Sequence, residues 1–462
     1  MRRTATLAAL AAAAISAPVR SQTEVPVLPT RAAVQAMGAG RVTDPRIPGL
    51  AIGRLAEDGR LAIGFGYLRE HAGPQVTPET LFEIGSITKA FTGVLLAEMA
   101  LRGEVALDDP VSRHLPPGMV VPEKDGVAIT LRHLSSHTSG LPRLPGNLAP
   151  ANNEDPYADY SPAQLTAFLA NHELRRAPGV QYEYSNLGAG LLGWALAHSA
   201  GRDYEALIRE RVLAPLGMNE TVILVPDGLG GRFATGHNGM GEPTSPWAIP
   251  TLAGAGALRS TVNDMLRFAA AARDTTSGPL GPAMALSQRE VFRVDSTMAV
   301  GLGWHHMTRK GRTYVWHNGG TGGFRSMLAV DHAANRASVA LGNSTESNDA
   351  VAIALLDSTV TLPALPPMKV TVEVDSASAA RFIGEYQLTP QFIISIKPRT
   401  GGKLQLQATG QGALRLYPSS PVDFFVTEVE ASVTFQLDTN GKVASLVLHQ
   451  NGQDLPAGRI TP

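Results

Sequence analysis

The proline-rich residues 362–371 divide the 462-residue chain into two parts with different sequence patterns. Pro363, Pro366 and Pro367 fall within this short stretch, and closely spaced prolines favour an extended linker. Before the linker, apolar residues recur with both helical and strand spacing, whereas residues 372–462 show mainly the alternation of strands. The sequence therefore predicts two domains, of which the second is a small all-β domain.

Strand signals recur through the C-terminal part. Residues 403–407 alternate strictly between polar and apolar side chains. Residues 433–437 and 443–448 flank Asn440-Gly441, a strong signal for a two-residue hairpin turn. We expect residues 372–462 to form a barrel or a sandwich.

The N-terminal part shows strand patterns, a long helical stretch, and strand patterns again. Asp58-Gly59 separates two strand-like segments, and short helical patterns broken by Pro and Gly fill residues 105–290. This order predicts one mixed α+β domain over residues 23–361, interrupted by an all-α subdomain. The expected elements are strands at 49–55 and 61–67, a helix at 85–101, helices beginning near residues 187 and 261, and strands within 301–343.

Charge and cysteine content exclude several classes of function. Lys and Arg number 39 and Asp and Glu number 40, so the net charge of −1 gives no reason to expect a nucleic acid partner. The chain has no cysteine, which excludes disulfides, cysteine nucleophiles and thiolate metal sites. Nothing in the sequence points to an obligate protein partner.

The N-terminus has the pattern of a secretory signal peptide. Arg2 and Arg3 precede an apolar, alanine-rich run, and small or polar residues and a proline follow it. We expect residues 1–22 to be a signal peptide and the protein to be exported, to the periplasm or beyond. The alternative is an alanine-rich N-terminal helix. The run is too short for a permanent membrane span, and no other segment is long and apolar enough, so we expect no integral membrane segment after cleavage.

Ser86 and Lys89 have the spacing of a nucleophile and its base. Serine needs a base within hydrogen-bond reach to attack a carbonyl, and helix positions three apart lie on one face. A helix beginning near Ser86 would place Lys89 beside the hydroxyl and would aim its positive dipole end at the developing charge. Lys89 must be neutral to accept a proton, so this mechanism predicts a dry site with few carboxylates. The alternative is that Ser86 merely caps a helix.

Two further groups complete a candidate site. In Tyr184-Ser185-Asn186, a tyrosine hydrogen-bonded to lysine can relay a proton to a leaving group, and Asn186 can contact both the lysine and a substrate amide. The alternative is a helix-entry turn with Asn186 as a local cap.

The motif His317-Asn318-Gly319-Gly320 could present a strand to the substrate, with the N–H of Gly320 joining that of Ser86 in an oxyanion hole. Gly319 would let the backbone approach closely. The same His-x-Gly pattern occurs at His71 and His237. We prefer His317 because strand-like residues surround it.

Together and in this order, the motifs resemble the serine β-lactamase and penicillin-binding protein family, in its class C-like and D,D-carboxypeptidase-like branch. The resemblance covers about residues 30–360 and implies an antiparallel sheet flanked by helices. The stretches that carry it are Leu81 to Lys89, Ile129 to Leu134, Ser136 to Pro142, Pro178-Gly179 ahead of Tyr182 to Asn186, Pro215 to Met218, and His317 to Phe324.

The resemblance implies roles for these residues. Ser86 is the expected acylated nucleophile, Lys89 and Tyr184 the general-base pair, and Asn186 a contact to the substrate and the lysine. His317 stands where class C β-lactamases usually have the lysine of a Lys-Thr-Gly motif. Neutral histidine is not a fixed cation for a substrate carboxylate. This departure resembles D,D-peptidase, D-aminopeptidase and esterase relatives and argues against efficient β-lactam hydrolysis.

The C-terminal part resembles, more loosely, the lipocalin-like domain often joined to such hydrolases, with residues 382–388 as its entry signature. The expected activity is two-step acyl transfer to water, without cofactor or metal, on a small amide: a β-lactam or a D-amino-acid peptide. A carboxylesterase is the alternative within the fold. An exported ligand-binding protein without catalysis is the alternative from another class.

Overall fold

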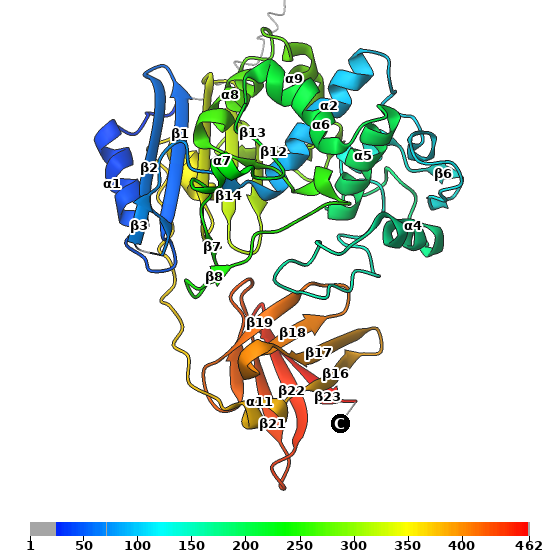
Figure 1. Ribbon diagram of the computed structural model, residues 1–462, viewed down its shortest axis with the longest axis vertical. Coiled ribbons are helices and arrows are strands. Elements are labelled where there is room, and N and C mark those ends of the chain that lie inside the picture. Colours follow the sequence, from blue (N-terminus) through cyan, green and yellow to red (C-terminus); the bar gives the residue numbers. More distant parts are fainter. Residues whose placement is uncertain (1–24, 71, 461–462) are drawn as a thin grey trace, which may run out of the picture.

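The computed structural model describes residues 25–70 and 72–460. The expected signal peptide, residues 1–22, lies outside this range. The described chain forms a mixed helix and sheet domain and a C-terminal β-barrel, joined by an extended segment without helix or strand at residues 361–375 (Figure 1). The predicted fold class, α+β with a small all-β domain, is confirmed. No helix in the described part of the chain has the length and apolar character that crossing a membrane requires.

A nine-stranded antiparallel sheet forms the centre of the first domain, in the order β10-β11-β12-β13-β14-β15-β1-β2-β3. β1 and β2 occupy the first two predicted strands, and Ala56 and Gly59 pair at the hairpin between them. The strands are β1 (Gly49–Ala56), β2 (Gly59–Arg69), β3 (Ala72–Gln75), β10 (Phe292–Arg293), β11 (Met298–Val300), β12 (His305–Arg309), β13 (Arg312–Gly320), β14 (Arg325–Asp331) and β15 (Arg336–Gly342).

Helices cover both faces of the sheet, because its central strands carry apolar side chains on both sides. In β1, Ile52 packs with α1 (Arg31–Arg41) and α10 (Asp349–Ala354), whereas Ala51 belongs to the core on the opposite face. That second core contains α2 (Thr88–Leu101) and α8 (Val262–Arg273). Figure 1 shows α1 on one side of β1 and β2, with α8 and α2 on the other.

Residues 105–290 are mostly helical but differ from an all-α subdomain in two ways. They contain short strands, such as the pair β5 (Glu123–Lys124) and β6 (Val127–Ala128), which forms because Asp125 and Gly126 both adopt positive φ in the turn. In addition, α8 packs on the central sheet. The other helices are α3 (Leu131–Ser135), α4 (Pro162–Asn171), α5 (Asn186–Ser199), α6 (Tyr204–Ile208), α7 (Asp227–Gly230) and α9 (Gly281–Gln288); the other short strands are β4 (Phe82–Glu83), β7 (Gly236–His237), β8 (Pro243–Thr244) and β9 (Arg259–Ser260).

The C-terminal domain is a closed barrel of eight antiparallel strands, preceded by α11 (Ser376–Ala380). Phe382, Phe424 and Phe435 pack against one another inside it. The strands are β16 (Gly384–Thr389), β17 (Phe392–Pro398), β18 (Leu404–Ala408), β19 (Ala413–Pro418), β20 (Asp423–Phe425), β21 (Ala431–Leu437), β22 (Val443–Gln450) and β23 (Gln453–Arg459).

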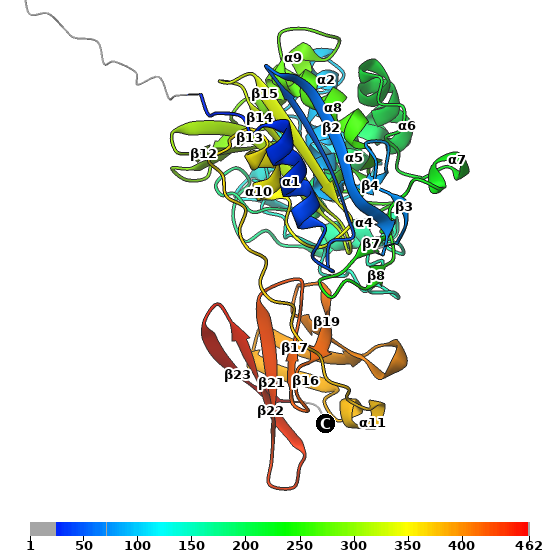
Figure 2. The same cartoon turned by 90° about the vertical axis from the view of Figure 1, so that its left-hand side faces the viewer.

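The barrel docks on loops of the first domain through polar contacts. Glu154 forms ion pairs with Arg399 and Arg415 of the barrel. Asn238 donates a hydrogen bond to the Tyr417 hydroxyl at 2.8 Å. Both views show the barrel against one end of the first domain, with β19 nearest to it (Figures 1 and 2).

Candidate active site

Ser86 lies in a tight turn that enters the central helix α2. A 3₁₀ turn, Gly85–Ile87, precedes α2, and the N-cap position of α2 is occupied by Ile87 and not by Ser86. The Ser86 hydroxyl is therefore not used to cap the helix. Instead it accepts a hydrogen bond from Lys89 Nζ at 2.8 Å. The spacing of three residues brings the two groups together as predicted.

Lys89 is buried, with 2% of its surface exposed. Its Nζ also donates to the Ala255 carbonyl at 2.7 Å. Burial, followed by the charge of Arg143, lowers the pKa of Lys89 well below its usual value. Glu83, the acid nearest in sequence, accepts hydrogen bonds from Arg259 at 3.1 Å and from the Trp247 backbone at 2.9 Å. The environment of Lys89 thus favours the neutral amine, as a general base requires.

Tyr184 and Asn186 lie where α5 begins, and both line the same cleft as Ser86. The Tyr184 ring centroid lies 4.9 Å from Lys89 Nζ. Burial raises the pKa of the phenol, although its hydrogen bond to Ser86 opposes the shift, so the hydroxyl stays protonated. Asn186 Nδ2 donates to the Tyr157 hydroxyl at 3.4 Å. Asn186 Oδ1 is buried and has no hydrogen-bond partner among the described residues.

The end of β13 lies directly against the Ser86 turn. A Cβ atom on Gly319 would come within 2.0 Å of the Ile84 carbonyl oxygen, so only glycine fits there. Gly85 has φ +49°, and a Cβ on it would lie 2.7 Å from Gly320 N. The Gly320 amide therefore lies close to the residue that precedes Ser86.

His317 is buried away from the cleft. It has 0% exposure, its Nδ1 lies 2.6 Å from the Asn318 carbonyl oxygen, and its ring lies 4.8 Å from that of His305. Burial, then His305 and Lys89, lower its pKa well below the usual value. Residues 318–322, and not His317, are among the described residues that line the cleft. Its imidazole is thus an uncharged neighbour of Lys89. His237, of the alternative motif, lies in β7 with Nδ1 3.1 Å from the Asn343 carbonyl oxygen.

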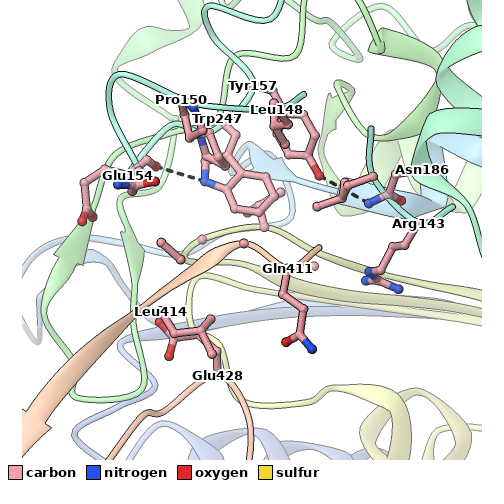
Figure 3. A pocket seen from close by; sticks show the side chains of 18 of the residues that line it. Arg143, Leu148, Pro150, Glu154, Tyr157, Asn186, Trp247, Gln411, Leu414 and Glu428 are labelled. Atoms are coloured by element: carbon pink, nitrogen blue, oxygen red, sulfur yellow. Dashed lines mark hydrogen bonds between the residues drawn. The ribbon is translucent and has the colours of Figure 1, made fainter. Parts of the chain in front are cut away.

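The cleft in front of Ser86 has a volume of about 670 Å³ and is lined by both domains. Figure 3 shows Trp247, Tyr157 and Asn186 of the first domain, with Gln411, Leu414 and Glu428 of the barrel across the pocket. The residues that line it include Ser86, Arg143, Glu154, Tyr157, Tyr184, Asn186, Trp247, Asn318, Gly319, Gly320, Arg325, Arg399, Gln411, Leu414, Arg415 and Glu428.

His137 and Arg143 are site residues that the sequence analysis did not identify. The His137 carbonyl accepts from Glu183 N at 2.7 Å, and its Nδ1 accepts from Ser185 N at 3.1 Å. Its ring lies 4.4 Å from that of Tyr184. His137 lies within the stretch 136–142 that carries part of the family resemblance, and Arg143 follows that stretch directly. Within the described ranges, no group of three or more His, Cys, Asp or Glu could hold a metal ion.

Comparison with known proteins agrees with this geometry. The sequence model of the Beta-lactamase family matches residues 31–360, and that of a domain of unknown function matches residues 368–457. The D-alanyl-D-alanine-carboxypeptidase/endopeptidase AmpH of Escherichia coli K12 is 31% identical over 290 residues, which is 59% of this chain and 74% of that protein.

Two further relatives point the same way. A beta-lactamase of Escherichia coli K12 is 31% identical over 269 residues, 57% of this chain and 67% of that protein. Penicillin-binding protein 4* of Bacillus subtilis is 26% identical over 425 residues, 86% of this chain and 91% of that protein. The chain therefore belongs to the Beta-lactamase family and is a serine hydrolase of the β-lactamase and D,D-peptidase type.

Proposed function

We propose that this chain hydrolyses small amides, either a D-amino-acid-containing peptide or a β-lactam, through an acyl-enzyme on Ser86. The observation that carries the proposal is the 2.8 Å contact between Ser86 Oγ and the buried Nζ of Lys89. Because desolvation favours the neutral amine, Lys89 is the group that takes the hydroxyl proton.

The reaction proceeds in two steps. As Ser86 Oγ attacks the carbonyl carbon, its proton passes to Lys89 and the carbonyl electron pair moves onto oxygen. The C–N bond then breaks, the leaving nitrogen receives the phenol proton of Tyr184, and the proton on Lys89 restores the phenol. Water attacks the acyl-enzyme, its proton passes to Lys89, and that proton returns to Ser86 Oγ as the acid leaves.

Tyr184 serves as the proton relay because its raised pKa keeps the phenol protonated while Lys89 is neutral. The unpartnered Oδ1 of Asn186 would accept an N–H of the substrate. The backbone N–H groups of Ser86 and Gly320 would hold the oxyanion, a contribution typically worth roughly 10²–10³-fold in kcat.

A carboxylesterase is the second candidate, favoured by the state of His317. Its buried, uncharged ring offers no fixed cation at the end of β13 for a substrate carboxylate. An ester substrate needs no such cation.

We further propose that the protein is exported, because Arg2 and Arg3 precede an apolar run typical of signal peptides. We assign residues 23–361 to the hydrolase domain, and residues 372–462 to a lipocalin-like barrel that contributes to the cleft.

The test is hydrolysis of a chromogenic cephalosporin, a peptide ending in D-Ala-D-Ala, and p-nitrophenyl butyrate by the purified protein and by Ser86→Ala. Turnover of the peptide or the cephalosporin that disappears in the variant supports the proposal. Turnover of the ester alone supports the carboxylesterase. Turnover of none of them would contradict both and leave a ligand-binding protein.

A further inference from the structure

Of the four arginines that line the cleft among the described residues, three have hydrogen-bond or ion-pair partners for their side chains and one has none. Arg399 and Arg415 both pair with Glu154. Arg325 donates to the carbonyl oxygens of Thr321 and Phe324 at 2.9 and 3.0 Å. Across the described residues, the remaining arginine, Arg143, has neither an ion pair nor a side-chain hydrogen bond, and it makes only a cation–π contact.

Arg143 is held close to the reacting groups. Its guanidinium carbon lies 5.1 Å from the centroid of the Tyr184 ring. Its backbone carbonyl accepts from Asn186 N at 3.0 Å, so its main chain is fixed to the start of α5. Figure 3 shows its side chain beside Asn186, on the side of the pocket away from Glu154.

Neither Lys89 nor His317 offers a cation to a substrate in the cleft. Lys89 is buried behind Ser86 and engaged with the Ser86 hydroxyl and the Ala255 carbonyl. His317 is buried against His305 and does not line the cleft. An exposed guanidinium without an acidic partner is suited to a planar anion, because its N–H groups match the two oxygens of a carboxylate.

We propose that Arg143 binds a carboxylate group of the substrate and is the residue that selects anionic substrates in this cleft. The inference rests on the proposed function and deepens it. It assigns to Arg143 the recognition of negative charge that His317, in its buried position, does not perform.

The experiment uses two pairs of D-alanyl thioesters. In the first pair, N-acetyl-D-alanine is linked to thioglycolate or to thioglycolamide, so the members differ by a carboxylate in the leaving group. In the second pair, the acyl group is N-succinyl or N-succinamoyl and the leaving thiol is neutral, so they differ by a carboxylate in the acyl part. The readout is the ratio of kcat/KM within each pair, at one pH, which cancels any effect on Lys89 that both members share.

The wild-type protein is expected to prefer the carboxylate member of at least one pair, and that pair shows which part of the substrate carries the charge. Arg143→Gln should lower this ratio roughly 10- to 100-fold, while turnover of the neutral members shows that the variant folds. Arg143→Lys should retain part of the preference. Arg113→Gln, at an exposed arginine paired with Asp109, should leave the ratio unchanged.

Two results would overturn the inference alone: a wild-type protein that turns over both members of each pair equally, or a carboxylate preference that survives in Arg143→Gln. Absence of turnover of all four thioesters by the wild-type protein would overturn the proposed function, and the inference with it.

Discussion

The Ser86–Lys89 pair depends on what surrounds the lysine rather than on the two residues alone. A lysine in water has a pKa of about 10.4 and is a poor base at neutral pH. Here Lys89 is enclosed by His137, His305, His317 and Tyr184, none of which is an anion at neutral pH. Arg143 adds positive charge from the cleft side. Each neighbour therefore favours a neutral amine or leaves it undisturbed.

Replacing Lys89 by arginine should abolish turnover. The guanidinium of arginine is always positively charged and therefore cannot accept the Ser86 proton at accessible pH. We expect kcat/KM to fall by on the order of 10³-fold or more, measured on whichever substrate the wild-type protein hydrolyses. Unchanged circular dichroism serves as the folding control. Activity within tenfold of wild type would exclude Lys89 as the base.

The pH dependence of kcat/KM should report the ionisation of Lys89. The neutral amine is the active form, so activity is present above the pKa of Lys89 in the folded protein and is lost as pH falls through it. Arg143→Gln removes a like charge that lowers this pKa, so the acidic limb should move to higher pH. A neutral substrate gives the cleanest profile. An acidic limb that stays in place or moves to lower pH in Arg143→Gln would contradict this electrostatic coupling.

His137 is a positioning residue whose loss should disturb Tyr184. Its Nδ1 holds the Ser185 amide, so His137→Phe keeps the ring shape and leaves a buried N–H without an acceptor. We expect kcat to fall more than KM rises, since the tyrosine would no longer be held for proton transfer. His137→Asn, which restores an acceptor, should recover part of kcat. Equal activity of the two variants would argue against this role.

At the residue scale, the sequence predicts those features that local spacing controls. Ser86 and Lys89 are three residues apart, and Tyr184 and Asn186 are two apart at a helix start, so local spacing predicts that the members of each pair lie near one another. The burial of His317 depends on packing of β12 against β13, which brings His305 to it. Arg143 becomes noticeable only when the partners of the other arginines are known.

At the element scale, the site depends on the close contact between the turn Gly85–Ile87 and the end of β13. The sequence predicted a helix from residue 85, and the structure begins α2 at Thr88 after a 3₁₀ turn. The difference matters, because the turn exposes Ser86 at the cleft instead of placing it within the first helical turn. Local pattern does not reveal it, since the close approach to Gly85 is made by β13, which lies far away in sequence.

Gly85→Ala tests this contact. Alanine at φ +49° is strained, and its Cβ would lie 2.7 Å from Gly320 N. We expect unfolding free energy to fall by roughly 1–3 kcal/mol and acylation to slow because the Gly320 amide is pushed from its place. Gly103→Ala is the control, since Gly103 also has positive φ but no atom within 4 Å of its would-be Cβ. Equal acylation rates in both variants would contradict the role of the contact.

At the scale of the whole molecule, the cleft in front of Ser86 is lined by both domains. Gln411, Leu414 and Glu428 of the barrel face the pocket (Figure 3). Composition and alternation predicted the β character of residues 372–462, and the Pro-rich linker predicted the separation. They could not predict where the barrel docks, because that depends on single polar partners such as Glu154 and Arg415.

Glu154→Gln should loosen the barrel, because one carboxylate holds both Arg399 and Arg415. We expect increased hydrogen exchange at residues 150–157 and 399–415, more so at low salt, where ion pairs contribute most in the wild type. Glu123→Gln, at an exposed strand away from the barrel, is the matched control. Unchanged exchange in Glu154→Gln would show that the other contacts suffice for docking.

The proposed mechanism requires a covalent intermediate on Ser86, which peptide-mapping mass spectrometry can detect after reaction with a fluorophosphonate or with a fluorescent penicillin. We predict a single adduct on Ser86, formed faster at pH 9 than at pH 6, absent in Ser86→Ala and strongly reduced in Lys89→Arg. A wild-type adduct on another residue, or labelling that persists in Ser86→Ala, would contradict it.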